Sequence, residues 1–220
     1  PAPRGTPVPV EAVRGRGQVA AVADSAAGQT PQETPGAGKR GEVIVWLRDN
    51  AGPDTIITNG AGNYAAFLHR YYRFRQRGTQ VAPTSGSMGY GLPAAVAAKL
   101  RCPDRTVVCL AGDGCLQMTI QELSTARQHG ADIIVVIANN GRYGTIRMHQ
   151  EKHYPGRVSG TELFNPDYVQ LAQAYGGTGH RIAETSQFGP AFEAARKGGL
   201  HLIELALDPR MLSTTKSLSG

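Results

Sequence analysis

The sequence is poor in cysteine and in aromatic residues, and it contains no long apolar segment. Only three of its 220 residues are cysteines, Cys102, Cys109 and Cys115, and they form no CxxC pair. An odd number of cysteines without such pairs argues against a disulfide framework and against a structural zinc site. No apolar run approaches the roughly 18 residues that a membrane span requires. We therefore expect a soluble protein of the reducing cytoplasm, with no membrane partner.

The first forty residues lack aromatic side chains and any sustained helical or strand period. They are rich in Pro, Gly, Ala and Gln, a composition typical of linkers and tails. The sequence also starts at Pro1 without an apolar leader, so we expect a fragment or a processed piece. We predict a flexible linker or the remnant of a preceding domain at 1–40, a folded domain at 41–210, and at 211–220 a tail that is either a frayed end or a lid.

The positive charge of the chain raises the question of a nucleic-acid partner. The formal net charge is +6 and the isoelectric point is about 9.4. Basic residues gather in FLHRYYRFRQR, residues 67–77, where a helix would place the aromatic side chains on one face and Arg70, Arg73 and Arg77 on another. No zinc-finger, RNP-type or basic-zipper pattern accompanies this segment. The pattern favours an amphipathic helix with a solvated basic face, and we expect no nucleic-acid partner.

Beyond residue 40, helical and strand patterns alternate. The patterns predict helices at 41–50, 64–76, 92–103, 116–130, 165–177 and 186–199, strands at 55–60, 79–86, 105–114, 131–140, 177–183 and 200–209, and an irregular stretch after residue 140. Strands that are apolar throughout and alternate with helices indicate an α/β fold, doubly wound, with a mostly parallel sheet and helices on both faces. In such sheets ligands bind at the carboxyl ends of the strands.

Two polar residues follow neighbouring strands of this predicted sheet. Asp113 comes directly after TVVCLAG, and Asn140 follows IIVVIAN. A right-handed crossover through one helix returns the chain to the same sheet, so both side chains can meet at one edge. Carboxylate, carboxamide and backbone carbonyl oxygens are ligands that Mg²⁺ or Ca²⁺ prefers. Gly112 and Gly114 allow the backbone to approach a phosphate, and the first amides of the next helix attract anions. The sequence therefore predicts a site for a metal diphosphate.

These motifs resemble those of the thiamine-diphosphate-dependent enzymes. Gly112, Asp113 and Gly114, followed after a spacer by Asn139 and Asn140, resemble the family signature. The segment APTSGSMGYGLPAA at 82–95 resembles the loop and helix that hold the aminopyrimidine ring, and QMTIQEL and NPDYVQLAQAYG also match. The similarity covers about residues 41–210 and is to the C-terminal diphosphate-binding (PP) domain, in the branch around acetolactate synthase.

The resemblance implies thiamine diphosphate and Mg²⁺ as cofactors. It implies that Mg²⁺ is bound by Asp113, Asn140 and the backbone carbonyl of Arg142. The residues implied to contact the cofactor are Asn59, Gly60, Gly62, Asn63, Gly86, Ser87, Met88, Gly112, Asp113, Gly114, Cys115, Asn140, Tyr143, Gly144 and Thr145. Among them, the carbonyl of Gly86 would accept a hydrogen bond from the cofactor's amino group, and Met88 would bend the cofactor into its reactive V shape. Taken singly, Met88 could be a core residue, Cys115 a small residue at a helix start, and Asn139 a turn former.

The resemblance also implies a reaction. Thiamine diphosphate supplies an ylid that attacks the carbonyl of a 2-oxo acid and stabilises the carbanion left after carbon dioxide departs. We expect a decarboxylating carboligase, acting on a substrate such as pyruvate and condensing the product with a second carbonyl. Two alternatives stay open. One is a decarboxylase that releases an aldehyde, similar to benzoylformate or pyruvate decarboxylase, and the other is a non-catalytic module that binds the cofactor.

The sequence departs from the family pattern in one domain. In the family, the glutamate that protonates the pyrimidine ring belongs to an N-terminal pyrimidine-binding domain, to which nothing here corresponds. Glu122, Glu151 and Glu162 do not stand in that context. The catalytic residue is therefore unknown, and this chain would hold half of a site that is shared between subunits. We expect a homo-oligomer, dimer or tetramer, a pyrimidine-binding domain in a full-length chain or another subunit, and no turnover by the isolated chain.

A second departure concerns the substrate. Acetolactate synthases usually carry a tryptophan where His149 stands. His149 and His153 are four residues apart, but the order HQEKH is not the HExxH of zinc proteases, and Pro155 weakens a long helix. We expect substrate-facing or structural histidines.

Overall fold

The computed structural model describes residues 38–210. Residues 1–37 and 211–220, which hold the predicted tail and nearly all of the predicted linker, lie outside the described residues. The described chain begins with helix α2 (Gly38–Asn50), slightly before the boundary at residue 41 that the composition suggested. This difference matters because it brings Arg40, a buried residue, into the folded unit.

Six parallel strands form one sheet with the order β2-β1-β3-β4-β6-β5. The strands are β1 (Ile56–Asn59), β2 (Gln80–Val81), β3 (Val107–Gly112), β4 (Ile134–Asn139), β5 (Thr178–Ile182) and β6 (His201–Ala206). After β2 the chain crosses back over β1 to form β3 on its other side. A ligand crevice is expected at such a switch point, outside the carboxyl ends of the strands. The predicted parallel α/β fold is confirmed.

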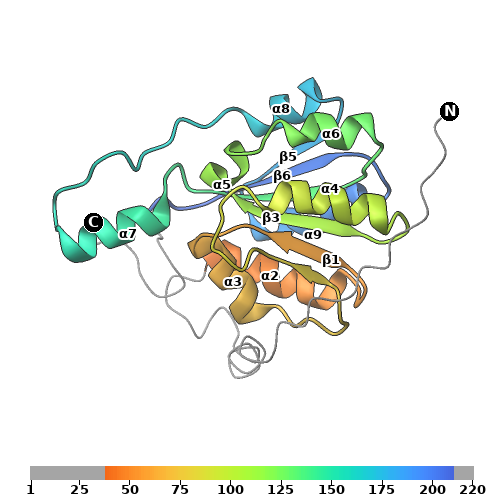
Figure 1. The fold of residues 1–220 in the computed structure, drawn as a ribbon, viewed down its shortest axis with the longest axis horizontal. Coiled ribbons are helices and arrows are strands. Elements are labelled where there is room, and N and C mark those ends of the chain that lie inside the picture. Colours follow the sequence, from red (N-terminus) through yellow and green to blue (C-terminus); the bar gives the residue numbers. More distant parts are fainter. Residues whose placement is uncertain (1–37, 211–220) are drawn as a thin grey trace.

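Helices cover both faces of the sheet (Figure 1). The remaining helices are α3 (Asn63–Tyr71), α4 (Gly91–Arg101), α5 (Asp113–Gln117), α6 (Glu122–Gln128), α7 (Gly144–His153), α8 (Tyr168–Ala174), the 3-10 helix η2 (Thr185–Gln187) and α9 (Phe188–Ala195). Residues of α2, α3 and α9 pack in one apolar cluster, and residues of α4, α6 and α8 pack in the other. Helix α7 has no buried residue and stands to one side of the sheet.

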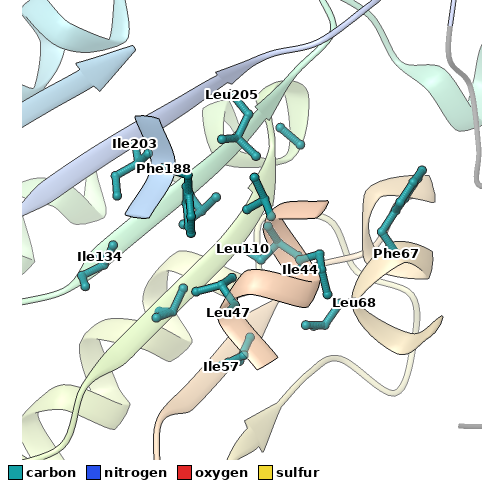
Figure 2. Packing of buried hydrophobic residues seen from close by; sticks show 14 of the residues in the cluster. Ile44, Leu47, Ile57, Phe67, Leu68, Leu110, Ile134, Phe188, Ile203 and Leu205 are labelled. Atoms are coloured by element: carbon teal, nitrogen blue, oxygen red, sulfur yellow. The ribbon is translucent and has the colours of Figure 1, made fainter. Parts of the chain in front are cut away.

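The first cluster shows why the strand pattern is apolar throughout. Ile44 and Leu47 of α2 pack against strand residues such as Ile57, and Phe188 of α9 covers the other end of this face (Figure 2). The ring of Trp46 stands edge-on to Phe188, with the ring centroids 5.3 Å apart. Full burial of one large apolar side chain contributes about 1.5–3 kcal/mol. A strand covered on both sides gains this on every residue, so alternation of polar and apolar residues is absent.

The helix predicted at 116–130 is wrong in one respect, because two short helices, α5 and α6, replace it. Between them, the amide of Thr119 donates to the carbonyl of Leu116 at 3.2 Å, and the Thr119 hydroxyl donates to the carbonyl of Gly89 at 2.7 Å. Thr119 and Ile120 are β-branched and propagate a helix poorly. The break ties α5 to the glycine-rich loop before α4.

The helix predicted at 64–76 ends early, at Tyr71. Tyr72 is extended, with φ −90° and ψ 145°, and its ring contacts Phe74 at 4.8 Å between centroids. Arg73 and Arg77 therefore lie beyond the helix, and the predicted basic helical face does not form. Burial of both Tyr71 and Tyr72 outweighs the helical period here.

Two further boundaries differ from the sequence prediction. The strand predicted at 79–86 is reduced to Gln80–Val81, because Pro83 cannot donate to a strand ladder. Conversely, the stretch after residue 140 that was expected to be irregular contains α7, a helix of 10 residues.

Within residues 38–210, no helix is long and apolar enough to cross a membrane.

Candidate functional site

A cavity of about 250 Å³ opens at the carboxyl ends of β1, β3 and β4. Its walls come from the loop-to-helix junctions after these three strands, from the loop after β2 and from α2. The lining residues are Arg40, Ala61, Gly62, Asn63, Tyr64, Gly86, Met88, Gly112, Asp113, Gly114, Cys115, Ala138, Asn140, Arg142, Tyr143, Gly144, Thr145 and Ile146. The cavity thus lies at the switch point of the sheet, and most of the residues implied by the resemblance line it.

Asp113 is the buried carboxylate of this cavity, with 3% of its surface exposed. Its Oδ2 accepts hydrogen bonds from the amide of Gly141 and from Nδ2 of Asn165, both at 2.8 Å. Burial raises the pKa of Asp113 above its usual range, and hydrogen bonds from Asn165, Gly114 and Gly141 oppose this shift. A cation bound at this carboxylate would offset the cost of its burial.

A chain of hydrogen bonds behind Asp113 fixes its orientation. Nδ2 of Asn165 also donates to Oδ1 of Asn139 at 2.8 Å, and Nδ2 of Asn139 donates to Oε1 of Glu204 at 2.7 Å. Glu204 is buried, and its Oε2 accepts from Nε of Arg181 at 2.9 Å. From the sequence, Asn139 was part of the family signature and, taken singly, could be a turn former. The structure shows instead that it links the site to β6.

The second predicted metal ligand, Asn140, lines the same cavity as Asp113. No hydrogen bond involves its side chain within residues 38–210. A carboxylate and an unengaged carboxamide facing one cavity are a hard-oxygen set that fits Mg²⁺. No group of three or more His, Cys, Asp or Glu side chains gathers to hold a metal in this part of the chain. A metal at Asp113 would thus take amide, carbonyl, phosphate or water oxygens as its other ligands.

The start of α7 forms another wall of the cavity. Gly144, Thr145 and Ile146 line the cavity there, and Tyr143 at the N-cap makes no side-chain cap. The first amides of a helix have no acceptor in their own helix and attract anions. The hydroxyl of Thr145 accepts from the amide of Asn63 at 3.0 Å and so joins α7 to α3.

Two glycines are required by close packing at the cavity floor. A Cβ on Gly114 would lie 2.5 Å from Cε1 of Tyr143, and one on Gly112 would lie 2.8 Å from Cδ1 of Tyr64. Any side chain at these positions would displace an aromatic ring that lines the cavity. The glycines predicted for phosphate approach therefore also set the shape of the walls.

Cys115 belongs to a buried network and is not merely a small helix-start residue. Its Sγ lies 3.1 Å from the hydroxyl of Tyr64 and accepts from the amide of Gly89 at 3.1 Å. The amide of Gly60 donates to the same Tyr64 hydroxyl at 3.0 Å. Burial, followed by the proximity of Cys115, raises the pKa of Tyr64 far above its usual value, so it stays a neutral phenol. The network joins the loops that follow β1 and β2 to α5.

The glycine-rich loop contributes Gly86 and Met88 to the cavity. Gly86 has φ +71°, a conformation that favours glycine, and Met88 also packs against the first apolar cluster. Three implied residues do not line the cavity: Asn59, Gly60 and Ser87. Asn59 is buried at the end of β1 and donates to the carbonyl of Gly60 at 2.9 Å, while the carbonyl of Ser87 accepts from the amide of Ala61 at 3.1 Å.

The two histidines of α7 lie beside the main cavity. His149 and His153 stack with their ring centroids 6.1 Å apart. They line a separate hollow of about 480 Å³, to which Ile146 also belongs. Neither Glu151 nor Glu162 lines the main cavity; Glu151 pairs with Arg147 at 2.7 Å, and Glu162 pairs with Arg142 at 3.2 Å.

Sequence reasoning missed Arg40, Asn165 and Glu204. Arg40 is 4% exposed, and its guanidinium lies 4.8 Å from the centre of the Phe67 ring. Burial lowers the pKa of Arg40 to about 10, and attraction by Asp113 opposes the shift. Asn165 carried one usable signal, since it precedes Pro166 and the α8 cap Asp167. Glu204 is the one acidic residue in the apolar run of β6, which is another signal.

The sequence of residues 60–205 matches the family described as "Thiamine pyrophosphate enzyme, C-terminal TPP binding domain". The chain belongs to this family. It is 39% identical over 145 residues to the acetolactate synthase large subunit of Parasynechococcus marenigrum (strain WH8102), an alignment covering 65% of this chain and 23% of that protein. It is 38% identical over 161 residues to the acetolactate synthase isozyme 3 large subunit of Escherichia coli (strain K12), covering 70% and 28% respectively.

A solved structure is similar as well. The thiamine diphosphate-dependent 4-hydroxybenzoylformate decarboxylase of Rhodococcus jostii RHA1 superposes with a TM-score of 0.72 and 32% sequence identity, covering 77% of this chain and 32% of that chain. The chain spans about a quarter of the length of the two acetolactate synthase subunits. It is a thiamine-diphosphate-binding domain of the acetolactate synthase-like type.

Proposed function

We propose that this domain binds Mg²⁺ and the diphosphate of thiamine diphosphate, as one half of a 2-oxo-acid decarboxylating carboligase of the acetolactate synthase type. The observation that carries the proposal is the meeting of Asp113 and Asn140 at one cavity, beside Gly114 and the start of α7. The donor set fits a hard divalent cation, and the adjoining backbone amides fit a phosphate.

Each wall of the cavity has a task in this proposal. Asp113, Asn140 and the carbonyl of Arg142 hold Mg²⁺, while Gly114, Gly144 and Thr145 approach the diphosphate. Gly86 and Met88 position the rest of the cofactor. When bound, thiamine diphosphate supplies the nucleophilic carbon and stabilises the carbanion that follows loss of carbon dioxide. The chain's own residues bind the cofactor and fix its orientation.

The activating glutamate is proposed to come from a pyrimidine-binding domain, either in a longer chain or in another subunit. Residues 38–210 form one sheet with its covering helices and contain no second domain of that kind. We therefore propose a homo-oligomer, a dimer or a tetramer, in which the cofactor lies between two domains, and no turnover by this chain alone. The three free cysteines fit a reducing cytoplasm.

A second candidate is a thiamine-diphosphate-dependent 2-oxo-acid decarboxylase that releases an aldehyde. It is favoured by the similarity to the Rhodococcus 4-hydroxybenzoylformate decarboxylase and by His149, which stands beside the cavity. The two candidates differ in the fate of the decarboxylated product. Product analysis with pyruvate, after the chain is combined with a pyrimidine-binding domain, separates acetolactate from acetaldehyde.

The proposal is tested by calorimetric titration of the chain with thiamine diphosphate, with and without Mg²⁺, beside Asp113→Asn. We expect saturable binding that requires the metal and is lost in the variant, whose fold is checked by circular dichroism. Binding that is indifferent to both the metal and the substitution would contradict the proposed role of Asp113. A folded chain that binds no cofactor even with the pyrimidine-binding domain present would be a non-functional relic or a module with another role.

A further inference from the structure

One charged side chain at the cavity has no role in the site described so far. Arg40 is the third residue of α2 and lies before residues 60–205, the segment that matches the family. It nevertheless lines the cavity together with Asp113 and is almost completely buried. A fully buried arginine is unusual unless it is paired with an anion.

Arg40 lacks such a pair within the described residues. Its Nε is buried without a hydrogen-bond partner, and its guanidinium forms no ion pair with any carboxylate of residues 38–210. The oxygen Oδ2 of Asp113 is engaged by Gly141 and Asn165 instead. The face of Phe67, drawn on α3 in Figure 2, holds the guanidinium by a cation–π contact. The side chain is thus positioned, but its charge is not matched.

The other arginine of the cavity is in a different state. Its Nε is also buried without a hydrogen-bond partner, but its Nη2 pairs with Glu162 at 3.2 Å, so Arg142 already has an anionic partner. An anion that enters the cavity would therefore gain more from Arg40 than from Arg142. The planar guanidinium presents paired N–H donors that match a phosphate or a carboxylate.

The position of Arg40 selects between these two kinds of anion. Arg40 lines the same cavity as Asp113, the proposed metal ligand, and as the backbone proposed to approach the diphosphate. The carboxylate of Asp113 offsets part of the positive charge of Mg²⁺. The metal bound at this carboxylate therefore does not neutralise the whole negative charge of a diphosphate. A second cation at this end supplies the remaining compensation.

We propose that Arg40 is a cofactor-binding residue whose guanidinium pairs with the diphosphate beside the metal. This inference rests on the proposed function, since it requires a diphosphate in the cavity. It adds a ligand from α2, which lies outside the matched family segment. It also gives a reason for the burial of an unpaired cation, namely that the ligand is its partner.

Inorganic pyrophosphate with Mg²⁺ is the suitable probe, because it needs only the diphosphate half of the site. Its affinity is measured by calorimetry for the wild-type chain, Arg40→Gln, Arg40→Lys and the control Arg48→Gln. Arg48 lies on the same helix, pairs with Asp49 at 2.8 Å and does not line the cavity. We expect Arg40→Gln to weaken binding about tenfold to a hundredfold, Arg40→Lys to weaken it less, and Arg48→Gln to leave it unchanged.

A readout without ligand separates binding from a structural role. Because Arg40→Gln removes an unpaired buried charge, the melting temperature of the ligand-free chain is expected to stay the same or rise. A marked fall, or equal losses of affinity in Arg40→Gln and Arg48→Gln, would overturn the inference. Wild-type affinity in Arg40→Gln would overturn it while leaving the proposed function intact. Arg40-dependent binding of pyrophosphate without any binding of thiamine diphosphate would contradict the proposed function, and with it the role of Arg40 in binding the cofactor. A wild-type chain that binds neither ligand would also overturn both.

Discussion

The side chain of Asn165 donates a hydrogen bond from Nδ2 to Oδ2 of Asp113 at 2.8 Å, across 52 positions of the sequence. Asn165 is held in turn by Gln117 of α5, whose Nε2 donates to Oδ1 of Asn165 at 2.6 Å. The segment that leads into α8 therefore orients the carboxylate proposed to bind the metal. Partners that orient a metal ligand affect affinity although they do not touch the metal.

Replacement of Asn165 by alanine is predicted to weaken Mg²⁺-dependent binding of thiamine diphosphate. Asp113 would lose one of the hydrogen-bond donors that fix its carboxylate, and the loss expected for such a partner is about tenfold to a hundredfold in affinity. Calorimetry measures the effect, with Asn50→Ala as the control because Asn50 is exposed at the end of α2. Unchanged affinity in Asn165→Ala would show that Asp113 does not depend on this bond.

Replacement of Asp113 by asparagine is predicted to separate stability from binding. Burial raises the pKa of Asp113, so its ionised form destabilises the ligand-free fold at neutral and higher pH. At pH 8 the ligand-free variant should be as stable as the wild type or more stable, by about 0.5–2 kcal/mol, while losing metal-dependent binding.

The sign of the pH effect gives the check. As the pH falls through the raised pKa, wild-type Asp113 becomes protonated and its burial cost disappears, so the difference between the variants should shrink. Urea denaturation at pH 8 and pH 5 measures this difference. A variant that is strongly destabilised at pH 8 would contradict the claim that the buried carboxylate of Asp113 lowers the stability of the ligand-free fold and serves to bind the metal.

Two glycines are predicted to respond differently to alanine. A Cβ on Gly179 of β5 would collide with the Cα of Val169 on α8, so helix and strand would have to separate, at about 3 kcal/mol or more. Gly130 has open space around it but a left-handed backbone, with φ +63°. Gly130→Ala should therefore lower the free energy of unfolding only by the backbone strain, about 1–2 kcal/mol. Denaturant unfolding of both variants tests the order, and equal costs would mean that α8 is not held against β5 as described.

Acid is predicted to destabilise the sheet edge at His180. Nε2 of His180 lies 3.2 Å from Nδ1 of His201, whose Nε2 lies 3.0 Å from the carbonyl of Gly198. Both contacts can be hydrogen bonds if Nε2 of His180 donates to Nδ1 of His201 and Nε2 of His201 donates to the carbonyl of Gly198. Burial, followed by the nearby His201, lowers the pKa of His180 below its usual value.

A histidine with a lowered folded-state pKa binds fewer protons when folded than when unfolded. Its contribution to stability is therefore complete above about pH 6.5 and is lost as the pH falls toward the folded-state pKa. In His180→Gln this loss of stability at low pH should be absent, because glutamine does not titrate. Its side chain can still donate to His201. Melting temperatures of both proteins between pH 7.5 and 5 provide the measurement, and parallel curves would contradict the prediction.

The sequence allowed the fold and part of the site to be predicted, for identifiable reasons. Asp113 and Asn140 follow apolar runs, and strand ends of a parallel sheet meet at one edge, so their common cavity could be anticipated. The break at Thr119 could not, because it depends on a hydrogen bond to Gly89 in a distant loop. Arg40 also escaped prediction, since its burial depends on packing against Phe67 and the composition around it resembles a linker.

The most direct test of the account is a crystal structure of the chain with thiamine diphosphate and Mn²⁺ in place of Mg²⁺. The anomalous signal of manganese locates the metal without reference to any assumed ligand. We predict one peak within bonding distance of the Asp113 carboxylate, the Asn140 carboxamide and the carbonyl of Arg142, with the diphosphate at the start of α7. A peak elsewhere, or a diphosphate bound away from these residues, would contradict the central claim.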